Sequence, residues 1–209
     1  MTKIYALKEL SHLMEGAPVT YFGCPFHLNI DDAIINYIES KIIWEAPFRT
    51  LILTNSHLFT LNLFDKLCSA YDSYEYEYEY NNKIYCFKDK ADKGDKKSEV
   101  QIFNFSSKKE LEKKIRPKYY NRVIFHFVDG NIENYLPQII PCTNALSFFT
   151  LDDEESLFYK LGEEELKNFF RLYDDKSNKK IEELEREGII DSKKERLLKG
   201  LFFPSEKNI

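Results

Sequence analysis

Polar side chains that could do chemistry follow two apolar runs of strand length. They are Asn55, Ser56 and His57 after the first run, and Asp129 and Asn131 after the second. Ligands of α/β proteins bind in the crevice outside the carboxyl ends of the strands. The spacing therefore predicts that any chemistry of these groups takes place in one crevice at the strand ends.

Two interpretations of this set stay open. His57, oriented by Asp129, would be a catalytic base, with Asn55, Ser56 and Asn131 as ligand-binding groups. The ligand would then be of nucleotide type, such as a nucleotide-sugar, and the protein a transferase. Alternatively, these residues are present because Asn, Ser and Asp suit the backbone of turns after strands. That interpretation predicts no catalysis.

Glycine-rich phosphate motifs are missing from the sequence. No G-x-x-x-x-G-K-[ST], G-x-G-x-x-G or G-x-S-x-G pattern occurs, and the seven glycines are scattered. The turn at 54–59, after the first predicted strand, contains neither glycine nor lysine. We therefore expect no hydrolysis of nucleoside triphosphates, no dinucleotide and no other cofactor.

Metal and thiol chemistry also find little support. The four cysteines form no C-x-x-C pair, which predicts small buried side chains in a reducing, cytoplasmic protein. The acidic run at 152–155 could hold a divalent cation, but acids at the start of a helix also favour its dipole. We favour the second interpretation and predict no metal site. His126, inside an apolar strand, is expected to be a hydrogen-bonded residue of the core or of a sheet face.

Helical and strand-like segments alternate along the chain. The expected helices cover 30–43, 57–70, 108–115 and 132–139, and the expected strands cover 48–54, 99–105, 122–128 and 145–151, with a hairpin over 74–88. Such alternation predicts an α/β fold, a Rossmann-like, largely parallel sheet of about five strands with flanking helices. The tyrosines at 74–80, in the first strand of the predicted hairpin, would either pack at the edge of the sheet or form a platform on which bases or a partner stack.

The chain is expected to have two parts. Residues 1–151 form the α/β core domain with a helical N-terminal lead-in over 1–48, and residues 152–209 form a helical C-terminal extension. The longest apolar runs span six or seven residues, where a membrane helix needs about 20, so no membrane span or secretion signal is expected.

The charge balance bears on possible partners. A net charge of −5, from 30 basic and 35 acidic residues, argues against nucleic-acid binding over the whole surface. A local basic patch stays open, and the lysine-rich loop at 88–98 is the candidate.

One stretch resembles a known family. Residues 111–142 contain a helix ending near Pro117, an apolar strand, a polar turn at 129–131 and Leu-Pro-Gln-Ile at 136–139. In this order the segment is similar to the clamp-loader delta-prime-type subunits of the AAA+ proteins. The resemblance covers about 50 residues. It implies that the helices from Asp153 onward look like the family's lid.

Departures from that family define the expected function. The predicted strand that contains Gln101 to Phe105 has no acidic pair for magnesium, and Ile140-Pro141 stands where an arginine finger belongs. The resemblance thus implies a degenerate member without ATPase activity, a non-catalytic interaction protein. It would be an AAA-like accessory subunit of a DNA-replication or other macromolecular assembly, binding a protein partner through its C-terminal helices. The transferase interpretation is the alternative.

Overall fold

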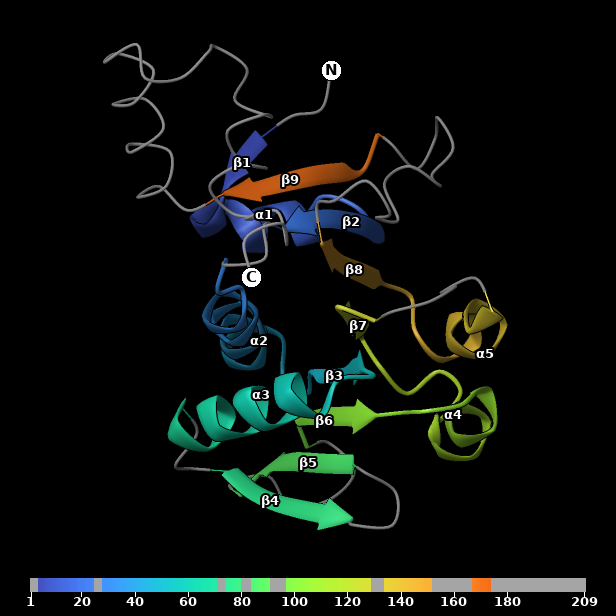
Figure 1. The fold of residues 1–209 in the computed structure, drawn as a ribbon. Helices are drawn as coiled ribbons and strands as arrows, with labels where there is room; N and C mark the ends of the chain where they lie inside the picture. Colours follow the sequence, from blue (N-terminus) through green and yellow to red (C-terminus); the bar gives the residue numbers. More distant parts are fainter. Residues whose placement is uncertain are drawn as a thin grey trace, which may run out of the picture.

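In the computed structural model, the described residues are 4–24, 28–70, 74–79, 84–90, 97–128, 134–151 and 167–173. Their nine strands form one sheet in the order β1-β9-β2-β8-β7-β3-β6-β5-β4 (Figure 1). The strands are β1 (Ile4–Ala6), β2 (Val19–Cys24), β3 (Arg49–Thr54), β4 (Tyr74–Glu79), β5 (Ile84–Asp89), β6 (Glu99–Asn104), β7 (Arg122–His126), β8 (Leu146–Leu151) and β9 (Phe169–Tyr173). The seven strands from β1 to β6 in this sheet order pair in parallel. Strand β5 pairs antiparallel with β6, and β4 pairs antiparallel with β5 as a hairpin.

Helices cover both faces of the sheet (Figure 1). They are α1 (Leu10–Glu15), α2 (Asp31–Glu45), α3 (His57–Ala70), α4 (Lys108–Lys114) and α5 (Leu136–Ile139), with 3-10 turns η1 (Leu7–Glu9) and η4 (Ile140–Cys142). Helices α1, α2 and α3 lie on one face, and α4 and α5 lie on the other. Among the described residues, no helix combines the length and the apolar character needed to cross a bilayer.

Each central strand contributes to two apolar cores, because successive side chains of a strand point to opposite faces. In β3, Ile52 packs in the core under α1, α2 and α3, whereas Leu51 and Leu53 pack in the core under α4 and α5. All three are at most 1% exposed. Burial on both sides explains the continuous apolar runs, as in other parallel sheets. The predicted fold class, an α/β protein with a largely parallel, helix-flanked sheet, is confirmed. The expected number of about five strands is wrong, because the described residues contribute nine strands to the sheet.

The helical lead-in expected over 1–48 is wrong in part. Helices α1 and α2 are present, but strands β1 and β2 also lie in this segment, and β2 pairs with both β8 and β9. Within β2, Phe22 is fully buried and stacks on Phe149 of β8, with ring centroids 4.8 Å apart. A six-residue strand containing a glycine gives little pattern of its own, and its neighbours stabilise it. Strand β3 is consequently the third strand of the chain.

The helical C-terminal extension expected over 152–209 is wrong at residues 169–173. Residues 169–173 are strand β9, which lies between β1 and β2 in parallel pairing. Phe169 and Leu172 are 3% and 0% exposed, so sheet burial decides the conformation of this segment. The other helices expected within 152–209, and the acidic run at 152–155, lie outside the described residues. The division of the chain at residue 151 stays a prediction.

The predicted hairpin over 74–88 is confirmed as β4 and β5, in register Glu77 to Cys86. Lys88 of β5 binds Glu77 of β4, with Nζ and Oε2 3.1 Å apart. The tyrosine side chains of β4 lie outside the described part, so neither interpretation of them is tested. None of the four cysteines forms a disulfide, and Cys24, Cys86 and Cys142 are buried as expected.

Candidate functional site

Two opposite ends of the sheet matter for function. The carboxyl edge is the end where the parallel strands β2, β3, β6, β7 and β8 finish, and the amino edge is the end where they begin. Helix α2 begins at the carboxyl edge, seven positions after the last residue of β2. In P-loop proteins the segment that joins a strand to the helix after it cradles the phosphates.

A buried histidine lies at the carboxyl edge. His126, the last residue of β7, is 0% exposed, and its Nε2 is 2.8 Å from Oδ1 of Asp31 on α2. The Phe59 ring of α3 meets the imidazole edge-on, with centroids 5.2 Å apart. Since Nδ1 has no partner in the described structure, we assign the proton to Nε2, which donates to the carboxylate. The expectation of a hydrogen-bonded core histidine is confirmed.

Lys66, on α3, binds the same end of α2 as His126 does. Nζ of Lys66, on α3, donates to Oδ1 of Asp32 at 2.8 Å and to Oδ1 of Asn29 at 2.9 Å. It also lies 3.8 Å from Oδ2 of Asp31. Asn29 and Asp31 flank Ile30, the N-cap residue of α2, and their side chains bind Lys66 of α3 and His126 of β7.

These residues do not fit magnesium and a nucleoside triphosphate. A P-loop presents a lysine and a Ser or Thr hydroxyl where its helix begins. Helix α2 presents Asp31 and Asp32 there, and the preceding sequence at 25–30 is Pro-Phe-His-Leu-Asn-Ile, without glycine or lysine. Two carboxylates repel phosphate, and Lys66 is already bound to them. The placement of Asp31 and Asp32 at the start of α2 therefore differs from that of a P-loop, as does the sequence before it.

The predicted site residues are only partly described. His57 is exposed and begins α3, and Ser56 caps this helix, its Oγ accepting from the amide of Phe59 at 3.4 Å. Ser56 thus has a conformational role, and Asn55 beside it is half-buried. Asp129 and Asn131 lie outside the described residues. Convergence of the five side chains, and catalysis by His57 and Asp129, stay predictions.

The amino edge contains a cavity of about 630 Å³. Its lining includes both charged and aromatic side chains: Glu15, Tyr37, Lys41, Glu45, Phe48, Arg49, Lys118, Tyr119, Tyr120 and Arg122, with Pro47, Asn121 and Asn144. Arg122 begins β7 and is 6% exposed. Its guanidinium donates to Oγ of Ser147 and to the carbonyl of Met14, both at 2.7 Å. This buried cation is held by neutral acceptors.

A second cavity, of about 370 Å³, adjoins the first at Tyr119. Glu99 in its wall is 5% exposed and accepts hydrogen bonds from Tyr119, Cys86 and Gln101. Burial alone would raise the pKa of Glu99, but these hydrogen bonds outweigh it and hold the pKa below its usual value. Burial and the bond to Glu99 raise the pKa of Tyr119 to about 12.

The ring of Tyr119 also contacts two guanidinium groups. The guanidinium carbons of Arg49 and Arg116 lie 4.5 Å and 4.9 Å from the centroid of its ring. Both cavities are lined by side chains of the stretch 108–122, which contains seven Lys or Arg and two Glu in a chain of net charge −5. Sequence reasoning placed the basic surface at 88–98 and missed this stretch, although the run Lys-Lys-Ile-Arg-Pro-Lys was a readable signal.

Comparison with known proteins identifies the fold. No family model matches the sequence, and neither does any curated protein. Among solved structures, the chain is similar to the large terminase ATPase domain of Thermus phage P74-26, with a TM-score of 0.55 at 10% identity, covering 96% of this chain and 92% of that one. It is also similar to the large terminase of a second, thermophilic bacteriophage, with a TM-score of 0.53 at 12% identity, covering 81% of this chain and 45% of that one.

These identities support a statement about architecture. The likeness extends over nearly the whole chain in the first comparison, and it includes the parallel sheet with helices on both faces. The expected likeness to an ATPase fold is thus supported at the level of architecture, and the comparisons give no specific link to clamp-loader subunits. This chain has the α/β fold of P-loop-type ATPase domains.

Proposed function

We propose that this chain is a non-hydrolysing, ATPase-fold interaction protein that works within a macromolecular assembly. One observation carries the proposal: the first turn of α2 presents Asp31 and Asp32, and His126 and Lys66 bind them. Charges that would repel a triphosphate thus occupy the place where a P-loop would attract it. An accessory role, like that of clamp-loader-type subunits, is one form of this function.

An exposed apolar pair supports the proposed interaction role. Ile43 and Trp44 are neighbours in the last turn of α2, and they are 66% and 83% exposed. Tryptophan is enriched among the residues that dominate protein interfaces. The C-terminal helices expected within 152–209 are a further candidate surface.

The test is binding of ATP, ADP and nucleotide-sugars, with and without magnesium, measured by thermal shift and calorimetry. A ligand at 100 times its Kd stabilises the native state by about 2.7 kcal/mol, which is readily measured. We expect no shift with any nucleotide, and a P-loop ATPase serves as the positive control. A shift with magnesium ATP would overturn the proposal. A shift with a nucleotide-sugar would favour the transferase interpretation, with His57 and Asp129 as its first residues to mutate.

A further inference from the structure

We propose that the amino edge binds single-stranded nucleic acid, through phosphate contacts to the stretch 108–122 and to the cavity that Arg122 lines. The inference deepens the proposed function, on which it rests, by naming the class of partner. It concerns the edge of the sheet opposite to the one where the nucleotide site is lost.

The balance of charges in the two cavities is the first argument. Among the described residues, four carboxylates line them, and all four bind groups of this chain: Glu77 binds Lys88, Glu15 and Glu45 bind Lys41, and Glu99 accepts from three neutral donors. None of these four is paired with Lys113, Arg116 or Lys118, which are exposed. The carboxylates therefore do little to offset these three charges, and the amino edge attracts anions.

The buried guanidinium of Arg122 is the second argument. Arginine is rarely buried unless an opposite charge accompanies it, because burial removes its hydration. Here its hydrogen-bond acceptors are a hydroxyl and a carbonyl, and the ring of Tyr37 lies 5.6 Å from its guanidinium carbon. A phosphate group in the 630 Å³ cavity would supply the missing negative charge.

The shape and the aromatic side chains favour a single strand over a duplex. Proteins that bind single strands combine a basic groove with flat groups on which bases stack, either aromatic rings or guanidinium planes. Tyr119, with Arg49 and Arg116 over its ring, provides such flat groups beside the cavity. The amides of Asn121 and Asn144, in the same lining, can bind base edges. An acidic peptide would use the charges but not the flat groups.

Binding is measured by fluorescence anisotropy of the full chain with a labelled oligothymidine of about 16 nucleotides, the upper site size for such grooves. A duplex of the same length and polyglutamate are the competitors. With about four phosphate contacts, affinity should fall about 50-fold between 50 and 200 mM salt. We expect the single strand to bind, and neither competitor to displace it at equal charge concentration.

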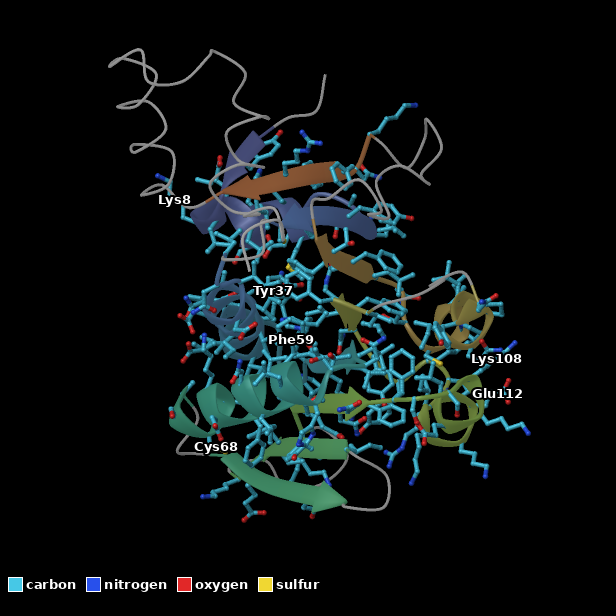
Figure 2. All side chains as sticks on the ribbon, in the orientation of Figure 1. Lys8, Tyr37, Phe59, Cys68, Lys108 and Glu112 are labelled. Atoms are coloured by element: carbon cyan, nitrogen blue, oxygen red, sulfur yellow. The ribbon has the colours of Figure 1, made fainter. Side chains whose placement is uncertain are left out.

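Matched charge reversals locate the surface. Arg116→Glu and Lys118→Glu should each weaken binding about tenfold and reduce the salt dependence by about one phosphate contact. Lys8→Glu is the control, because Lys8 is exposed beside β1, at the far end of the sheet from α4 (Figure 2). It should change the affinity less than about twofold.

Three results would overturn the inference. They are no binding of the oligonucleotide, equal or tighter binding of the duplex or of polyglutamate, and an equal effect of Lys8→Glu. If the oligonucleotide fails to bind while ATP also fails, the amino-edge inference is wrong and the proposed loss of nucleotide binding stands. If ATP binds, the proposed function is wrong whatever the oligonucleotide does.

Discussion

The carboxyl edge and the amino edge of this sheet use charged residues in opposite ways. At the carboxyl edge, Asp31 and Asp32 are bound by a histidine and a lysine. At the amino edge the carboxylates are also bound within the chain, but Lys113, Arg116 and Lys118 remain exposed beside two cavities. The comparison teaches that the ability of each edge to bind a charged ligand depends on which of its charges are paired within the fold. A charge that is paired within the fold contributes little electrostatic potential at the surface, where a ligand would bind.

The largest effect should come from the buried histidine. His126→Ala removes a ring packed against Phe59 and leaves Asp31 without its donor, so we expect a loss of about 3 kcal/mol in the free energy of unfolding. His57→Ala, at the same edge but exposed, is the matched control and should cost less than about 0.5 kcal/mol. Urea unfolding of both variants measures the difference, and equal losses would contradict a buried structural role for His126.

The next effect concerns the Glu99 carboxylate at the amino edge. Tyr119→Phe removes a hydrogen bond to a charged group and should cost about 2 kcal/mol at neutral pH. Since the folded-state pKa of Glu99 is lowered, its contribution to stability is present above the usual glutamate pKa, about 4.3, and is lost as the pH falls through the lowered value.

Ionisation of Tyr119 affects the stability at high pH. Its folded-state pKa is raised from 10.0 to about 12, so its contribution is complete below pH 10 and is lost as the pH rises toward 12. The stability difference between the wild type and Tyr119→Phe should thus narrow at both extremes of pH. Tyr120→Phe is the control, because its hydroxyl donates to the neutral amide of Gln101 at 2.7 Å and the cost should not depend on acid pH. A pH-independent effect of Tyr119→Phe would refute this account.

The smallest effect compares one lysine from each edge. Lys66→Ala breaks an ion pair with Asp32, whose side chain is 66% exposed, and should cost about 0.5 kcal/mol. Lys41 at the amino edge is less exposed than Lys66 and binds two glutamates, so Lys41→Ala should cost more. Thermal unfolding of both variants checks this order. The reverse order would mean that the carboxyl-edge network stabilises the fold more than its exposure suggests.

Prediction of the fold from the sequence succeeded where strands are buried on both faces. The centres of two predicted strands, Leu51 to Leu53 and Val123 to Phe125, consist of consecutive apolar residues, so their pattern indicates strands without help from their neighbours. Strands β1, β2 and β9 escaped prediction for different reasons: β1 has three residues, β2 contains Thr20 and Gly23 among its apolar residues, and β9 follows a charged segment typical of helices. Pairing with strands distant in sequence decides their conformation.

The sequence by itself determined that no P-loop is present, because the absence of a glycine-rich lysine motif needs no coordinates. It also determined the alternation of elements and the buried character of His126. Only the tertiary structure decided that Asp31 is the partner of His126, that Arg122 is a buried cation, and that Tyr119 joins two basic cavities. Those facts depend on contacts between residues up to 108 positions apart, which no local pattern specifies.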